Sequence, residues 1–381
     1  MKVYLDNGAA TMVDPKVVKA MNPFFTEKFG NASSLHELGR ISHEALEKSR
    51  AIIAEKINAL PEEIIFTSGG TESDNIAIME TAFPNIEKKN HIITTKIEHP
   101  AVLQTCKFLE AHGFNVTYLG VDNEGFIDIK KLEQSITEKT VIVSIMHANN
   151  EIGTIQDIDA IGEICKKHHV AFHTDAVQSF TKVPIDVKKL NVDFISLSAH
   201  KIHGPKGIGA LYVRKGTRIK SLLKGGSQES KLRPGTENIP GIIGFAKAVE
   251  LASEAHIKKM EKLRDYFIGE IKKNFSDIVV NGTETERLCN NINVSFKGIE
   301  GESLLMHLDE KGIAVSTGSA CSSQSLEPSH VLLAIGLNAE VAHGSIRFTL
   351  SRFTTKEELD YTLNNLTEIV KNLRQISPLA K

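Results

Sequence analysis

The sequence predicts an α/β protein with a large, mostly parallel sheet and a second, smaller α+β domain. The chain has 381 residues, 41% of them hydrophobic, which is enough to bury a sizeable core in more than one domain. Short β-branched runs alternate with helical patterns between residues 64 and 214, and this alternation is typical of parallel strands joined by helices. After residue 215 the chain becomes rich in Gly, Ser, Lys and Pro, which predicts a connector into the second domain.

Seven apolar runs predict the strands of the large sheet because they are short, rich in β-branched residues and bounded by polar turns. In chain order they are 64–67, 92–97, 116–121, 141–146, 170–173, 194–197 and 208–213. Helices are expected where apolar residues recur at helical spacing, over 35–58, 100–111 and 157–168. Together these runs predict a seven-stranded, mostly parallel sheet.

The second half of the chain predicts the smaller domain. A long amphipathic pattern over 242–275 predicts one helix, and further helices are expected over 302–311 and from 356 to about 373. Strand-like runs stand at 278–280, 292–296 and 346–350. These elements divide the chain into a large domain at 13–250 and a small domain made of 1–12 and 251–381.

Charge and hydropathy exclude several classes of function. Forty-five basic and 47 acidic side chains leave a net charge of −2, and neither sign forms a long block, so we expect neither direct nucleic-acid binding nor a polybasic membrane patch. No uncharged apolar stretch reaches the roughly 18–20 residues of a membrane span, and the first residues show no signal-peptide pattern. We therefore expect a cytoplasmic protein that acts on a small molecule or a protein partner.

The four cysteines are far apart in the sequence and have none of the short spacings of zinc or redox sites. Cys106, Cys165 and Cys289 lie in or beside regular elements, and we expect them to be small buried side chains. Cys321 lies in the run 316–323 of small and polar residues, which predicts an exposed, mobile loop. The histidines lack a convincing ligand spacing as well, so no metal site is predicted.

Residues 67–75 follow a predicted strand and open a helix. Gly70 permits close approach of the backbone, and Thr71 adds a hydroxyl beside the free N–H groups of the helix N-terminus. These are the features of a phosphate cradle, although a plain capped turn explains the stretch equally well. The run is neither a Walker motif nor G-x-G-x-x-G, so a nucleotide is not implied.

Asn150, Asp175 and Lys201 each follow a different predicted strand, about one strand-helix-strand unit apart, so we expect them to face one crevice at the carboxyl ends of the strands. Asp175 and Lys201 could form a structural ion pair. A lysine beside Ser198, His200 and a phosphate cradle is also what a pyridoxal phosphate enzyme needs. Such an enzyme requires an amine for the Schiff base, an acid that keeps the pyridine nitrogen protonated and an anchor for the phosphate.

Two further residues have both a structural and a functional interpretation. His99 ends a strand, and Pro100 starts the next helix at a tolerated position. The His99 ring could be a satisfied group of the surface or core, or it could stack on a flat cofactor. Arg347 alternates with Ile346 and Phe348 in a predicted strand, and it could be a solvated charge or a clamp on a substrate carboxylate.

Taken together, these motifs resemble the cysteine desulfurases of the NifS and IscS type, which are pyridoxal phosphate enzymes of fold type I in the class-V aminotransferase family. The resemblance extends over nearly the whole chain. Its matching segments are 4–7, 13–15, 66–75, 98–99, 146–153, 175–179, 198–207, 233–238, 319–321 and 347–353.

The resemblance implies a role for each matching residue. Lys201, His99 and Cys321 are the implied catalytic residues: Lys201 would form the Schiff base with pyridoxal 5'-phosphate, His99 would stack on its ring and Cys321 would accept the sulfur. Asp175 would pair with the pyridine nitrogen. The other implied contacts are Gln178 and Asn150 at the phenolic side of the cofactor or the substrate, Arg347 on the substrate carboxylate, and Gly70, Thr71, Ser198, His200 and, from the other subunit of a homodimer, Thr236 on the phosphate.

The implied reaction removes sulfur from L-cysteine and leaves L-alanine and a persulfide on Cys321. The persulfide would pass to an acceptor such as an iron-sulfur scaffold protein, or serve tRNA thiolation or another sulfur-containing cofactor. A selenocysteine lyase or another aminotransferase-like enzyme would use the same Lys201 and Asp175, and a non-catalytic sulfur carrier could keep the same fold. A simple aminotransferase, however, needs no thiol, and a carrier needs no Schiff-base lysine.

Overall fold

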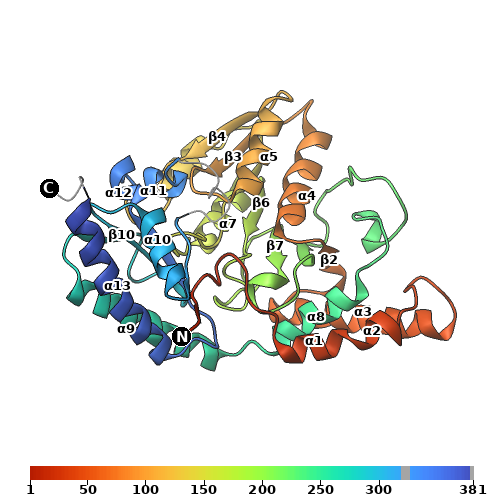
Figure 1. Ribbon diagram of the computed structural model, residues 1–381. Coiled ribbons are helices and arrows are strands. Elements are labelled where there is room, and N and C mark those ends of the chain that lie inside the picture. Colours follow the sequence, from red (N-terminus) through yellow and green to blue (C-terminus); the bar gives the residue numbers. More distant parts are fainter. Residues whose placement is uncertain (319–326, 378–381) are drawn as a thin grey trace.

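The structure is a computed structural model that describes residues 1–318 and 327–377 (Figure 1). Its centre is a seven-stranded sheet with the strand order β2-β8-β7-β6-β5-β3-β4. The strands are β2 (Ile64–Thr67), β3 (His91–Thr95), β4 (Asn115–Leu119), β5 (Thr140–Ser144), β6 (Ala171–Asp175), β7 (Phe194–Ser198) and β8 (Gly209–Val213). Strand β8 runs antiparallel to β2 and β7, and the other neighbouring pairs are parallel. The predicted seven-stranded, mostly parallel sheet is therefore confirmed.

Alternate residues of each strand point to opposite faces of this sheet, and helices cover both faces. Ile64 and Phe66 of β2 pack on one face, while Ile65 packs on the other. The first face is covered by α3 (Glu37–Lys56), α7 (Ile158–Lys167) and α8 (Ile239–Glu250), and the second by α4 (Gly70–Ala82) and α5 (Pro100–Glu110).

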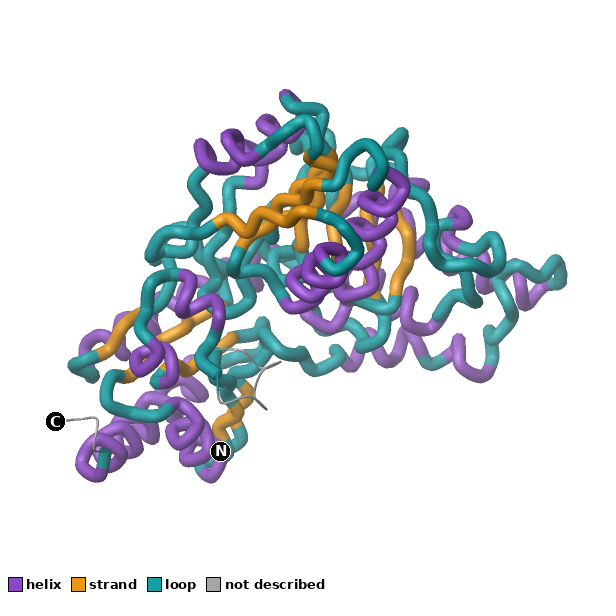
Figure 2. Tube along the Cα trace, turned by 90° about the horizontal axis from the view of Figure 1, so that it is seen from above, coloured by secondary structure: helices purple, strands orange, loops and turns teal. Residues whose placement is uncertain are grey.

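A second group of elements builds its own core to one side of the large sheet (Figure 2). Strand β10 (Asn291–Phe296) pairs antiparallel with β9 (Ile278–Val280) and β12 (Ser345–Thr349), and β1 (Val3–Tyr4) pairs parallel with β11 (Ile313–Ala314). The helices packed on these strands are α9 (Glu254–Asn274), α10 (Gly301–Glu310) and α13 (Lys356–Ile376). Separate cores support the division into 13–250 and 1–12 with 251–381, which stays a prediction.

Shorter helices complete the described chain. The α-helices among them are α1 (Pro15–Met21), α2 (Pro23–Thr26), α6 (Ile129–Ser135), α11 (His330–Ala334) and α12 (Ala339–His343). The 3₁₀ helices are η1 (Pro61–Glu63), η2 (Phe83–Asn85), η3 (Ala199–Lys201) and η4 (Glu229–Lys231).

The prediction of a single helix over 242–275 is wrong. Two helices, α8 and α9, occupy this stretch, and the chain turns between them at residues 251–253. Helix α9 begins where the Ser253 hydroxyl accepts a hydrogen bond from the His256 N–H at 3.4 Å. The sequence signal of the break is this N-cap, which helical periodicity alone does not reveal.

The structure describes three of the four cysteines. Cys106, Cys165 and Cys289 are buried, as predicted. Cys321 belongs to residues 319–326, which lie outside the described part of the chain, so the loop expected there stays a prediction. None of the helices in the described residues has the length and apolarity needed to cross a bilayer.

Candidate active site

A cavity of about 360 Å³, here called the Lys201 cavity, lies at the carboxyl ends of the parallel strands. The sequence-predicted residues that line it are Gly70, Thr71, His99, Asn150, Asp175, Gln178, Ser198, His200, Lys201 and Arg347. Arg347 reaches the cavity from β12 of the second group, whereas the others end or follow strands of the large sheet. Two predicted site residues are not part of this lining. Thr236 is exposed elsewhere on the chain, and Cys321 lies outside the described residues.

Lys201 ends η3 directly after β7, and this position brings its amine into the cavity. Its Nζ donates hydrogen bonds to the backbone carbonyls of Gly8 and Ala9 at 2.6 and 2.7 Å. Gln178 Nε2 donates to the same Gly8 oxygen at 3.0 Å. The N-terminal segment therefore forms one wall of the cavity and holds the amine at a defined position.

Asp175 is the last residue of β6 and is only 7% exposed. The Val177 N–H donates to its Oδ1 at 2.8 Å. Burial, followed by the charge of the nearby Asp74 carboxylate, raises the pKa of Asp175 to about 7. Asp74 lines the same cavity, and burial raises its pKa to about 7 as well. This wall favours a cationic partner, because a positive charge would stabilise the ionised carboxylate.

The N-terminus of α4 and the end of β7 form another part of the cavity lining, and its chemistry suits an anion. The first N–H groups of a helix have no partner within the helix, and α4 begins at Gly70. A Cβ at this glycine would lie 2.6 Å from Val177 Cγ2, so the tight approach excludes a side chain. Ser198 Oγ and His200 Nδ1 lie 2.8 Å apart beside it. Burial and then the charge of Lys201 lower the pKa of His200 to about 4, so a neutral ring offers hydrogen bonds here at neutral pH.

His99 has a structural role and also faces the cavity. It is the N-cap of α5, and its Nδ1 accepts a hydrogen bond from the Ala101 N–H at 3.1 Å. Burial, followed by the charges of Lys201 and His330, lowers the pKa of His99 to about 4. The ring is therefore neutral at pH 7, and its lining position leaves the stacking hypothesis intact.

Arg347 is only 1% exposed, which shows that the solvated-charge interpretation is wrong. Its Nη2 pairs with Asp6 Oδ1 at 3.0 Å, and its Nη1 donates to the Asn150 carbonyl at 3.1 Å. Within the described residues its Nε has no hydrogen-bond partner. The guanidinium of this cavity-lining residue therefore keeps one donor without a partner among these residues, a feature that suits the binding of a planar carboxylate.

Four residues that bond or charge the site were not among the predicted site residues. Gly8, Ala9 and Asp74 line the cavity, and Asp6 pairs with Arg347. Asp74 had a usable signal, because it stands four positions after Gly70 and therefore on the same face of α4. The other three act through backbone carbonyls or through a partner far along the chain, and neither leaves a local pattern.

Comparison with known proteins places the chain in a family. It matches the family model "Aminotransferase class-V" over residues 3–362. It is 56% identical over 380 residues to the cysteine desulfurase IscS of Dictyoglomus turgidum, with 99% of this chain and 96% of that protein covered.

Two solved structures agree with this placement. A NifS-like protein superposes with a TM-score of 0.92 at 42% identity, covering 98% of this chain and 100% of that one. SspA, solved in complex with cysteine, superposes with a TM-score of 0.84 at 40% identity, covering 93% of this chain and 100% of that one. The chain therefore belongs to the class-V aminotransferase family, among its cysteine desulfurases of the IscS and NifS type.

Proposed function

We propose that this protein is a cysteine desulfurase that uses pyridoxal 5'-phosphate to remove sulfur from L-cysteine and transfers that sulfur to Cys321. The observation that carries the proposal is the convergence of three charged side chains in one cavity: the Lys201 amine, the Asp175 carboxylate and the Arg347 guanidinium. The IscS relatives and the cysteine complex of SspA support the choice of substrate.

The residues present in the cavity fit pyridoxal phosphate. The Lys201 amine can form a Schiff base. Asp175, whose ionised form is costly to bury, suits a protonated ring nitrogen. The first N–H groups of α4, together with Thr71, Ser198 and His200, suit a phosphate dianion.

When bound, the cofactor supplies an electron sink that weakens the Cα–H and Cβ–S bonds of cysteine. Lys201 Nζ would take the α-proton and return it during turnover. Arg347 would bind the substrate carboxylate and thereby orient Cα toward that amine. The neutral His99 ring would lie against the cofactor from the start of α5.

The sulfur step is a transfer to the Cys321 thiolate. This thiolate attacks the substrate sulfur, so an S–S bond forms as the Cβ–S bond breaks. The electron pair of the broken bond stays with carbon and becomes a C–H bond after protonation. Carbon is thereby reduced to the methyl group of alanine, sulfur is oxidised to the outer sulfur of a persulfide, and no external oxidant is needed.

We propose further that the active protein is a cytoplasmic homodimer. Thr236 lies exposed on the segment between β8 and α8, from which it would complete the phosphate site of a second copy. The persulfide sulfur would pass to an acceptor protein such as an iron-sulfur scaffold.

Intact mass spectrometry after brief exposure of the holoprotein to L-cysteine tests the function. We expect a gain of one sulfur atom, absent in Cys321→Ser, together with alanine formation that Lys201→Ala abolishes. A mass gain retained in Cys321→Ser would show that another group accepts the sulfur. Alanine from selenocysteine but none from cysteine would identify a selenocysteine lyase, and sulfide release unchanged in Lys201→Ala would exclude catalysis through this lysine.

A further inference from the structure

We propose that Glu151 is a positioning residue that holds together the two ends of the segment carrying Cys321. The inference rests on the proposed function, in which Cys321 accepts the sulfur, but its evidence comes from other residues. Gly318 precedes residues 319–326, which the structure does not describe, and Ser329 follows them.

Ser329 fixes the returning end of the segment to Glu151. Its Oγ donates a hydrogen bond to Glu151 Oε2 at 2.5 Å. As the N-cap of α11, Ser329 Oγ also accepts hydrogen bonds from the Val331 and Leu332 N–H groups, both at 3.2 Å. One hydroxyl therefore ties the start of a helix to the carboxyl group of the residue that follows Asn150, which lines the cavity.

Gly318 brings the outgoing end to the same carboxylate. A Cβ at Gly318 would lie 2.9 Å from Glu151 Oε2 and 3.0 Å from Ser329 Cβ. The two ends of the segment thus lie on either side of a single oxygen atom, at a spacing where an added Cβ would displace the Glu151 carboxyl group or Ser329.

Glu151 can act as a fixed point because the large sheet and the second group both hold it. It is only 1% exposed, and its N–H donates to Asn149 Oδ1 at 2.8 Å. Its carbonyl accepts the Asn291 and Asn293 amides from the start of β10, each at 3.1 Å. A group bonded from two regions in this way has little freedom to shift.

The same contacts connect Glu151 to the proposed substrate site. The carbonyl of Asn150, the preceding residue, accepts Arg347 Nη1 at 3.1 Å. The Arg347 backbone exchanges hydrogen bonds with Ser316, N to O at 2.7 Å and O to N at 3.2 Å. Arg347 and the two ends of the Cys321 segment are therefore fixed against one turn of chain, which sets where the thiol-bearing segment starts relative to the substrate carboxylate.

Ser329 and Gly318 are better targets for a test than Glu151, because Arg347 and His330 also face Glu151 and its replacement would disturb the substrate site. We would mix holoenzyme bearing Ser329→Ala or Gly318→Ala with L-cysteine under single-turnover conditions. Cysteine binding is followed by the cofactor absorbance, and persulfide on Cys321 by quenched intact mass. We expect persulfide formation to slow about 10- to 100-fold, as misplaced reacting groups do, while the affinity for cysteine stays unchanged and Ser329→Thr restores the rate.

Two matched variants control for the loss of a Ser–Glu bond and for a Gly→Ala change. Ser303 donates to Glu300 Oε2 at 3.1 Å on the exposed face of α10, and Gly269 in α9 has open space where a Cβ would stand. Ser303→Ala and Gly269→Ala should form persulfide at the wild-type rate.

The outcomes separate the two proposals. Wild-type rates in both Ser329→Ala and Gly318→Ala would overturn the positioning role of Glu151. Weaker cysteine binding with an unchanged sulfur step would also overturn it, since the effect would then be on the substrate. Wild-type holoenzyme that forms no alanine from cysteine would instead overturn the proposed function.

Discussion

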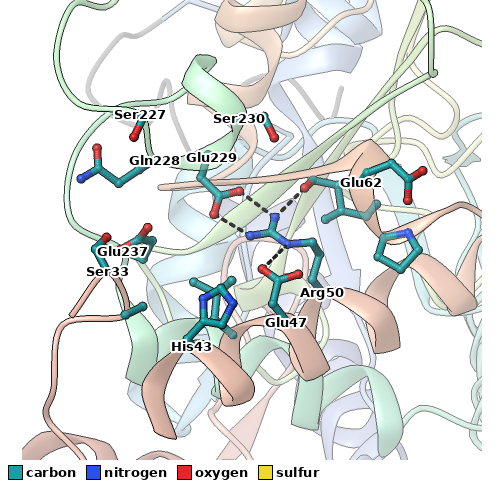
Figure 3. Close-up of a pocket in the computed structure, with 14 residues that line it drawn as sticks. Ser33, His43, Glu47, Arg50, Glu62, Ser227, Gln228, Glu229, Ser230 and Glu237 are labelled. Atoms are coloured by element: carbon teal, nitrogen blue, oxygen red, sulfur yellow. Dashed lines mark hydrogen bonds and ion pairs between the residues drawn. The ribbon is translucent and has the colours of Figure 1, made fainter. Parts of the chain in front are cut away.

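Each of two pockets in this protein is lined by one buried arginine, and the two arginines differ in how many of their N–H donors have a hydrogen-bond partner. The first is the Lys201 cavity, which Arg347 borders. The second, here called the Arg50 pocket, is larger at about 490 Å³ and lies where η4 meets α3 (Figure 3). In Figure 3 the carboxylates of Glu47 and Glu229 point at the Arg50 guanidinium.

The larger pocket has the more completely satisfied arginine. Arg50 donates to both oxygens of Glu229 at 2.8 Å, to the Ile64 carbonyl at 2.7 Å and to Glu47 at 3.2 Å. Glu229 also accepts the Phe66 N–H at 2.8 Å, so the pair bonds two backbone groups of β2, which is an edge strand of the sheet.

Arg347, in contrast, has two bonded groups and a buried Nε without a partner among the described residues. Volume therefore does not identify the active site in this molecule. The active site is identified instead by an arginine donor that has no partner in the described part of the chain and that belongs to a cavity with a lysine and a buried acid.

The largest effect that tests this comparison is on stability, at Arg50. Arg50→Ala leaves the buried Glu229 carboxylate without its partner, and breaking such a pair costs about 3–5 kcal/mol of unfolding free energy. Urea denaturation of the variant and the wild type measures the loss. Lys215→Ala is the control, because its 3.4 Å pair with Glu62 is exposed at the same pocket and should change stability by about 1 kcal/mol or less. A raised KM for cysteine with full stability in Arg50→Ala would reverse the comparison.

A somewhat smaller effect is expected at Arg347, and it should fall on catalysis. Arg347→Ala removes the donor proposed for the substrate carboxylate, and losing one partner of a buried charge pair costs about 2–4 kcal/mol, or roughly 30- to 1,000-fold in kcat/KM. Steady-state alanine formation over a range of cysteine concentrations measures it. The loss should appear mainly in KM. If KM is unchanged, Arg347 serves only to hold Asp6, and the two arginines are alike.

The large sheet could be predicted from sequence for a physical reason. A strand such as β7 is buried along its whole length, so it appears as a short run in which apolar residues alternate with small serines. Lys201 and Asp175 could be found because they directly follow such runs. The break before α9 was missed because one capping serine, Ser253, decides it.

The rest of the site depends on contacts that no local pattern encodes. The carbonyls of Gly8 and Ala9 hold the Lys201 amine, yet a carbonyl is common to every residue type. Asp6 meets Arg347 across almost the full length of the chain. The stretch 67–75 was ambiguous between a cradle and a capped turn, and only its position in the Lys201 cavity favours the cradle.

The smallest expected effect is on the pH dependence of stability, and it comes from the carboxyl groups. The buried carboxyl group of the Arg50 pocket is paired with an arginine, whereas those of the Lys201 cavity are not, among the described residues. In the Arg50 pocket Glu229 is neutralised by its pair. In the Lys201 cavity burial raises the pKa of Asp74 and Asp175 to about 7, and it raises that of Glu98 behind them to about 8. Ordinary values are near 4, so the folded chain binds more protons than the unfolded chain. The extra bound protons stabilise the folded state. This contribution to the free energy of unfolding is complete below pH 4 and is lost as the pH rises through 7 to 8.

Histidines oppose this trend only below pH 6.5. Burial lowers to about 4 the pKa of five of them: His99, His147, His173, His200 and His203. Their contribution therefore rises with pH and is complete once the unfolded chain has lost the same protons near pH 6.5. Between pH 6.5 and 8 the buried acids dominate, and Glu80, whose pKa burial raises to about 7, adds to them. Lys182, whose pKa burial lowers to about 8, opposes them only toward the upper end of this window. The stability of the cofactor-free protein should therefore fall.

Asp74→Asn should flatten that fall. One acid with a folded pKa of about 7 contributes about 1 kcal/mol over this pH window, and removing its charge also lowers the pKa of Asp175, which the Asp74 carboxylate raises. Urea denaturation of the cofactor-free protein at pH 6.5 and at pH 8 measures the difference, with Glu368→Gln on the exposed side of α13 as the control. An unaltered pH dependence in Asp74→Asn would mean that this acid ionises at no cost. The cavity would then differ from the Arg50 pocket in its hydrogen bonds alone, because its acids would be as well stabilised as Glu229.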